Sequence, residues 1–127
     1  MSFAPVEPGV IRVLYDTEAD MAPQSQAGLL RALENQLTFG PVGIVFAVPR
    51  VAVVDRSVPT FWLDITKRMA PKLCALAIAS PSVAVRTAAR AFAVANTVRG
   101  VGVTVTAFNT EDEALRWVRA QVRAQGG

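Results

Sequence analysis

"LCALAIASPSVAVRTAARAFAVANTVRGVGVTVTAF" runs from Leu73 to Phe108 and reads as two strands with a helix between them. Leu73–Ala79 is a short, wholly apolar run, which is typical of a strand covered on both faces. The small polar turn "SPS" then opens a long helix from Ser82 to about Val98, which Gly100 closes. The last part, "VGVTVTAF", alternates Val with Thr and predicts a second strand. A strand–helix–strand unit of this kind predicts two parallel strands in one sheet.

The same alternation of strands and helices extends toward both ends of the chain. The other expected strands are Val10–Tyr15 and Val42–Val48, and the other expected helices are Gln24–Phe39, Pro59–Met69 and Thr110–Arg123. Val51–Asp55, "VAVVD", is either another short strand or an apolar loop. The order β-α-β-(β)-α-β-α-β-α predicts an α/β layer structure with a largely parallel sheet of about four to five strands and about four helices. No repeat or linker interrupts it, so we expect a single domain, 1–127, with an ordered core of about 10–124.

The composition narrows the classes of function. Hydrophobic residues make up 52% of the chain and charged residues 18%, which is typical of a globular protein with a real core. No apolar run reaches the roughly 18–20 residues of a membrane helix, and the N-terminus shows no signal-peptide pattern. We therefore expect a cytoplasmic protein with no integral membrane segment. The single cysteine, Cys74, lies in an apolar run and is expected to be a buried structural thiol.

The motifs of enzymes and cofactor sites are not found. The chain contains no histidine, which removes Ser–His and Cys–His nucleophile systems and argues against zinc. Neither of the two glycine-rich phosphate-loop patterns occurs. A receiver domain would also have an acid after a strand, as at Asp55. It would further need paired acids for magnesium and a lysine near the last strand, but Asp16 and Glu18 are spaced as in a connecting loop and "TAFNTEDE" contains no lysine. No enzyme, catalytic residue, metal ligand or cofactor is predicted.

The net charge of +3 is unevenly distributed. Residues 1–64 contain four basic and seven acidic residues (−3), whereas residues 65–127 contain nine basic and three acidic residues (+6). A basic half can contact nucleic acid or anionic lipid, or it can simply be a solvated surface. The arginines are dispersed, however, and aromatic residues are not interleaved with them. We expect Arg86 and Arg90 to form the exposed stripe of the long helix, and we expect no nucleic-acid partner.

Ser57 stands between the apolar run Val51–Asp55 and the helix Pro59–Met69. The serine is either a helix cap, a phosphorylation site or a nucleophile. A cap contributes about 1 kcal/mol. A phosphate would place negative charge beside Arg56 and the start of a helix. A nucleophile is the least favoured reading because the chain has no histidine to activate it. We expect Ser57 to cap the helix and to be accessible to solvent.

Phe61, Trp62 and Leu63 are consecutive in the same helix. Because successive helical residues point about 100° apart, one helix on a sheet does not bury all three on a single face. If Phe61 enters the core with Ile65, then Trp62 lies to the side and Leu63 points away. Trp62 and Leu63, together with Asp55, Arg56 and Ser57, are therefore a candidate partner surface, for a second copy of the chain or for another protein. The alternative is that the neighbouring helix covers Trp62 and leaves Leu63 alone in solvent.

Two segments resemble a known family. "GIVFAVPRVAVVDRSVPTFWL" (Gly43–Leu63) resembles the central segment of STAS domains, in which Asp-Ser-Ser-Gly opens a helix. Asp55 matches the Asp and Ser57 the second Ser, while Arg56 stands at the first Ser and Val58 at the Gly. "EDEALRWV" (Glu111–Val118) is similar to the ending of the SpoIIAA-like branch of the STAS/SEC14 group. The resemblance covers roughly residues 10–120.

The resemblance carries its own expectations about function. It implies the fold of bacterial anti-sigma-factor antagonists, a protein partner, and phosphorylation of Ser57 by a partner kinase. The function expected is therefore a non-enzymatic, regulatory protein–protein interaction module. The SEC14 side of the resemblance implies an alternative, a domain that binds a small molecule or a lipid.

Overall fold

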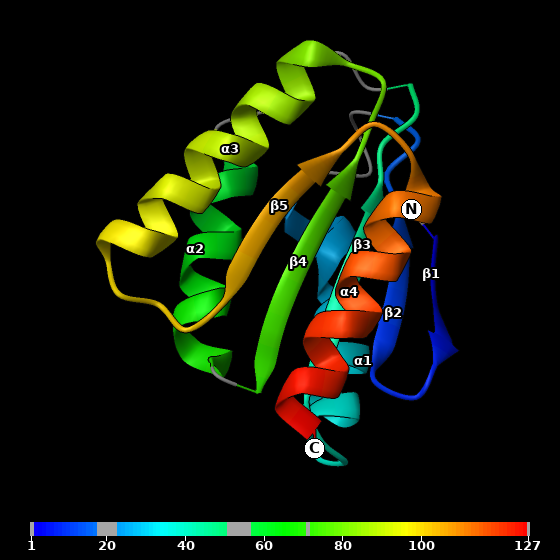
Figure 1. Ribbon diagram of the computed structural model, residues 1–127, viewed down its shortest axis with the longest axis vertical. Coiled ribbons are helices and arrows are strands. Elements are labelled where there is room, and N and C mark those ends of the chain that lie inside the picture. The colour runs from blue at the N-terminus through cyan, green and yellow to red at the C-terminus, as the bar shows by residue number, and fades with distance from the viewer. Residues whose placement is uncertain (1, 18–22, 51–56, 71, 127) are drawn as a thin grey trace.

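A five-stranded sheet with helices on both faces forms the fold in the computed structural model, which describes residues 2–17, 23–50, 57–70 and 72–126 (Figure 1). The strands are β1 (Ser2–Glu7), β2 (Val10–Leu14), β3 (Val42–Ala47), β4 (Leu73–Ala79) and β5 (Thr104–Phe108). The helices are α1 (Pro23–Leu37), α2 (Ser57–Met69), α3 (Val83–Val98) and α4 (Glu111–Gly126). The strands lie in the order β1-β2-β3-β4-β5, with β2 to β5 parallel and β1 antiparallel to β2. The predicted α/β class, with its largely parallel sheet, is confirmed.

One face of the sheet is covered by three helices, α1, α2 and α3, which we call the three-helix face. Large side chains fill the space between these helices and the sheet, among them Leu29, Leu33, Ile44, Phe46, Trp62, Ile65, Leu76 and Phe92. Helix α2 lies between the other two and contacts both of them. This layer contains most of the hydrophobic core.

The opposite face is covered by α4, and we call it the α4 face (Figure 1). Its core is small, with Val10, Val45, Ala77 and Ala79 on the sheet and Ala114 and Val118 on the helix. Helix α4 approaches so closely that a Cβ atom placed on Gly43 would lie 2.5 Å from Val118 Cγ1. Small residues on the sheet therefore allow a helix to pack tightly where there is little room for side chains.

The ends of α3 and α4 form as the sequence predicts. Ser82 is the N-cap of α3, and its hydroxyl accepts a hydrogen bond from the backbone N–H of Val85 at 3.3 Å. Gly100, with φ of 69°, follows the C-cap residue of that helix. At the start of α4, the hydroxyl of Thr110 accepts from the backbone N–H of Glu113 at 3.4 Å, as expected for a capping box.

The fifth strand is not the one that the sequence suggested. The optional strand Val51–Asp55 lies outside the described residues, whereas Ser2–Glu7, before the expected core, forms β1 and pairs with β2. None of its residues is fully buried, and it contains Pro5. Because an edge strand of this kind has no alternating apolar pattern, only its pairing with β2 identifies it.

Candidate functional site

The carboxyl ends of the four parallel strands meet at one edge of the sheet. Pairing continues one residue past three of them, since the backbone N–H groups of Tyr15, Val48 and Ser80 donate to Ala47, Ala79 and Phe108, at 2.9, 2.9 and 3.1 Å. The amino-terminal ends of α2 and α3 follow β3 and β4 at this same edge. In open α/β sheets ligands bind at the carboxyl ends of strands, so this edge is the first place to search for a site.

An apolar hollow of about 80 Å³ lies at this edge, between α2, α3 and the sheet, and it opens to solvent on one side. Its lining comes from the sheet, from the first two turns of α2 and from α3 as far as Phe92. The lining residues are Tyr15, Phe46, Val48, Val58, Pro59, Trp62, Leu76, Ile78, Val85, Ala88, Ala89 and Phe92. We call this feature the α2–α3 hollow. None of these residues carries a formal charge.

A rigid cluster of aromatic and polar groups forms one wall of the α2–α3 hollow. The rings of Tyr15 and Phe46 lie parallel with centroids 5.6 Å apart, and Phe46 meets Trp62 at 76° with centroids 5.0 Å apart. The Oε1 atom of Gln26 in α1 accepts hydrogen bonds from the Tyr15 hydroxyl and from Trp62 Nε1, the latter at 2.9 Å. Gln26 is only 1% exposed. One buried amide thus ties α1 and α2 to Tyr15, the residue that follows β2, and fixes both rings.

Gln26 was not predicted from the sequence, although its spacing gives a signal. It precedes Leu29, Leu33 and Leu37 by three, seven and eleven residues, so it lies on the buried face of α1. A glutamine in line with buried leucines needs a partner, because an unpaired buried amide costs about 1–3 kcal/mol. That reasoning marks Gln26 as a polar residue of the core.

The predicted partner surface is wrong for Trp62. Its side chain is 4% exposed and belongs to the core, and Ile65 is 1% exposed, whereas Phe61 and Leu63 are half-buried against the same core. The reason is that α2 is flanked by α1 and α3, so a wide arc of its surface is covered. The alternative prediction is right that a neighbouring helix covers Trp62, since Gln26 of α1 bonds to it, but wrong to leave Leu63 exposed.

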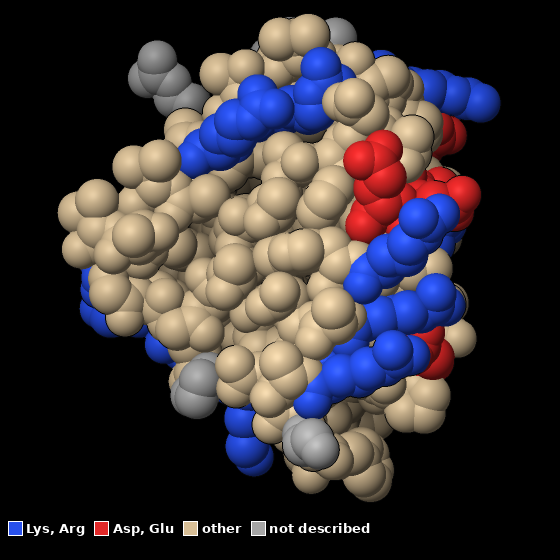
Figure 2. All heavy atoms as spheres, viewed as in Figure 1, with Lys and Arg blue, Asp and Glu red and all other residues tan. Residues whose placement is uncertain are grey.

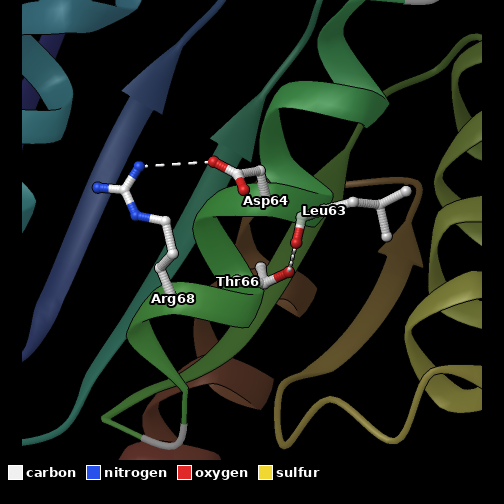
Figure 3. Close-up of polar contacts among 4 residues, drawn as sticks. All are labelled: Leu63, Asp64, Thr66 and Arg68. Atoms are coloured by element: carbon white, nitrogen blue, oxygen red, sulfur yellow. Dashed lines mark hydrogen bonds and ion pairs between the residues drawn. The ribbon is translucent and has the colours of Figure 1, made fainter.

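The solvent-facing side of α2 carries a charged pair rather than an apolar patch (Figure 3). Arg68 Nη1 lies 3.4 Å from Asp64 Oδ2, with both side chains more than half exposed. Leu63 points away from this pair, and its backbone carbonyl accepts a hydrogen bond from the Thr66 hydroxyl at 3.1 Å. The side of α2 that carries Asp64 and Arg68 is therefore an ordinary charged helix surface and not an apolar partner surface.

Ser57 is the first residue of α2, two residues before the expected start of this helix at Pro59, and its capping role stays a prediction. Asp55 and Arg56 lie outside the described residues, so their predicted roles are untested. At the carboxyl ends of β2 and β3, Arg50 Nε lies 3.5 Å from Asp16 Oδ1. Asp16 is thus engaged with a basic side chain. Phosphorylation of Ser57, and its accessibility, remain predictions.

The outward face of α3 is more apolar than predicted. Arg90 is exposed as expected, but the guanidinium of half-buried Arg86 donates to the backbone carbonyl of Ser80 at 2.8 Å. Val83, Val94 and Val98 are 66%, 63% and 80% exposed. The arginines therefore do not form a continuous exposed stripe, and Arg86 instead ties α3 to the end of β4.

Two ion pairs join α4 to the strands at the other end of the chain. Arg12 Nε lies 2.5 Å from Glu111 Oε1, and Arg119 pairs with Glu7. The hydrogen bond to Glu111 raises the pKa of the Arg12 guanidinium above its ordinary value. In Figure 2 basic and acidic side chains gather along α4, whereas the surface over β5 and much of α3 is uncharged. The expectation of no nucleic-acid partner stays a prediction.

The reactive residue types are few. Cys74 is buried, its Sγ donates to the carbonyl of Val42 at 3.5 Å, and burial raises the pKa of its thiol above the ordinary value. It is therefore a protonated structural thiol at neutral pH. Within the described ranges, no group of three or more His, Cys, Asp or Glu side chains is arranged to hold a metal ion. None of the described helices is both long and apolar enough to cross a membrane.

No protein-family model matches the chain, and neither the curated proteins nor the solved structures contain a match.

Proposed function

We propose that this chain is a non-enzymatic, cytoplasmic regulatory module of STAS type that binds a protein partner at the carboxyl edge of its sheet and is controlled by phosphorylation of Ser57. One observation carries the proposal. Helix α2 begins at Ser57, and its first turn, with Val58 and Pro59, forms part of the wall of the open, apolar α2–α3 hollow. The serine at the STAS-like turn therefore adjoins an uncharged recess.

The physical effect of the modification supports this role. A phosphate adds about −1.5 to −2 charges at neutral pH. At the first residue of α2 it would lie beside backbone N–H groups that have no partner within the helix. A partner that covered the apolar recess would remove this phosphate from water. Burying an unpaired charge is costly, so the phosphate would oppose binding. One modification would thus be tolerated by the fold and would oppose binding.

The contact surface differs from the one that the sequence suggested. Trp62 is buried, so it does not take part in a contact. The rim of the α2–α3 hollow and the exposed valine at the start of α3, Val83, are apolar surface at the same edge. A second copy of this chain and another protein are both candidates for the partner.

Affinity capture from the host, followed by mass spectrometry, tests the proposal. We expect partners to be retained by wild type and by Ser57→Ala and lost with Ser57→Glu. Thr104→Glu is the matched control, because it adds the same charge at exposed Thr104 at the far end of β5 and should leave capture unchanged. Light scattering of the purified protein separates self-association from binding of another protein. Unchanged capture by Ser57→Glu would refute control through this serine.

A second candidate function is the binding of a small molecule or a lipid. The observation that favours it is the apolar lining of the α2–α3 hollow. This candidate does not require Ser57 or a protein partner.

A further inference from the structure

We infer that the α2–α3 hollow is a binding site for a compact, neutral aliphatic group, presented either by a free small molecule or by the end of a longer acyl chain. The inference rests on the second candidate function, ligand binding, and is independent of the proposed protein partner. Its support comes from the size of the hollow, the chemistry of its lining and the rigidity of its walls.

The size of the hollow limits what enters it. Its volume of about 80 Å³ equals that of roughly three molecules of liquid water, each taking about 30 Å³. It is smaller than an engineered apolar cavity of about 150 Å³ that binds benzene and xenon. It is far smaller than the roughly 300–1,000 Å³ of typical sites for cofactors and drug-sized ligands. A whole lipid or nucleotide does not fit inside, whereas a branched group of a few carbon atoms does.

The lining selects against polar and charged ligands. Two of its side chains carry a hydrogen-bonding group, and the Tyr15 hydroxyl and the Trp62 N–H both already donate to Gln26. A polar group that entered would therefore lose its hydrogen bonds to water without replacing them. Water deep in the hollow is disfavoured for the same reason, because the lining offers it few polar partners.

Four aromatic rings line the hollow, which raises the question of a cationic ligand, since aromatic cages bind quaternary ammonium groups. The ring arrangement argues against it. Phe46 lies parallel to Tyr15 and perpendicular to Trp62, so these rings pack on one another instead of enclosing a common centre. No acidic side chain is among the residues that line the hollow. The site therefore favours a neutral group.

The walls of the hollow are held in place, so the hollow stays open when no ligand is bound. Gln26 fixes Tyr15 and Trp62, and strand pairing fixes Phe46. On the α3 side the lining is formed by Val85, Ala88, Ala89 and Phe92, and the two alanine side chains are too short to fill the space beside them. A larger side chain at position 88, which is half-buried, would occupy the hollow. This gives a direct way to test the site.

The test is a titration of methyl-labelled full-length protein followed by NMR, with three probes. Isobutanol is a compact neutral group, octanoate presents a similar group at the end of an acyl chain, and tetramethylammonium is a compact cation. We expect isobutanol and octanoate to shift the methyl signals of Val58, Val85 and Ala89, and tetramethylammonium to leave them unchanged. Tighter binding of octanoate would identify an acyl chain as the source of the group, and similar affinities would identify a free small molecule.

Two variants locate the binding. Ala88→Leu fills the hollow and should weaken binding of both neutral probes at least about tenfold, since burial of an aliphatic group is worth more than that factor. Ala84→Leu is the matched control, because exposed Ala84 belongs to the same helix but does not line the hollow, and it should bind as wild type does. Thermal melts check that both variants fold. Absence of shifts with both neutral probes, preferential binding of tetramethylammonium, or undiminished binding by a folded Ala88→Leu would each overturn the inference. None of these outcomes affects the affinity-capture test with the Ser57 variants, so the two proposals can fail separately.

Discussion

On the three-helix face, side chains as large as Trp62 and Phe46 fill the layer, a buried amide bridges three elements, and a hollow remains at the carboxyl edge. On the α4 face, Gly43 and Ala77 allow the helix to lie close to the sheet. Large, rigid side chains leave gaps where they do not interlock, whereas small residues let the helix follow the surface of the sheet closely. This difference in packing explains why the α2–α3 hollow lies on the three-helix face, which has the larger core.

The largest expected effect comes from removing the tryptophan of each face. Trp62→Ala should lower the free energy of unfolding by about 3–5 kcal/mol, because it opens a cavity and leaves Gln26 without one of its two donors. Trp117→Ala on the α4 face should cost roughly half as much, because Trp117 is only half-buried beside Phe108. Urea unfolding of both variants gives the comparison. Equal losses in the free energy of unfolding would show that the two faces contribute equally to stability.

A second pair of substitutions adds one methyl group to each face. Gly43→Ala should destabilise the protein by about 1–3 kcal/mol, because the new Cβ would lie 2.5 Å from Val118 Cγ1. Gly28→Ala in α1 should stabilise it by up to about 1 kcal/mol, because Ala favours a helix and the new Cβ meets the ring of Phe3 at an ordinary 3.7 Å.

Thermal or urea unfolding measures both glycine variants. Opposite signs would sharpen the contrast between a close-packed face and a looser one. A neutral Gly43→Ala would mean that α4 is able to move away from the sheet, against the account of this face.

The smallest expected effect concerns the ion pairs of α4. Glu111→Gln should lower the free energy of unfolding by less than about 1 kcal/mol, because Glu111 and Arg12 are both more than two-fifths exposed. The loss should shrink further in roughly 1 M salt, where exposed charges are screened. Asp64→Asn, which removes the exposed pair with Arg68 on the other side of the sheet, is the control and should behave similarly. A loss above 2 kcal/mol that resists salt would give this pair a structural role.

The order of elements was predictable because its signals are local. The apolar runs of β3 and β4, Ser82 before α3, and Thr110 with Glu113 before α4 each act within a few residues of sequence. Strand β1 was missed because it lies at an edge, contains Pro5 and shows no alternation, so its strand character depends on pairing with β2.

The site was predicted less well, for a physical reason. Helical spacing indicates that Phe61, Trp62 and Leu63 point in different directions, but it does not indicate what covers each direction. Contact with both α1 and α3 decides that, together with the hydrogen bond from Trp62 to Gln26. The α2–α3 hollow likewise depends on how distant residues such as Phe46 and Ala88 meet, which periodicity does not describe. The approximate start of α2 was predictable because its signal is local, although the helix begins at Ser57 and not at the expected Pro59.

The most direct test of the contrast between the two faces is a crystal structure of the protein under xenon pressure. Xenon occupies apolar cavities that exclude water. We predict a xenon peak in the α2–α3 hollow, between Phe46, Val85 and Phe92, and no peak under α4. A peak beneath α4, or an empty hollow at the pressure at which other apolar cavities fill, would contradict the claim that the three-helix face retains an open apolar site while the α4 face is closed.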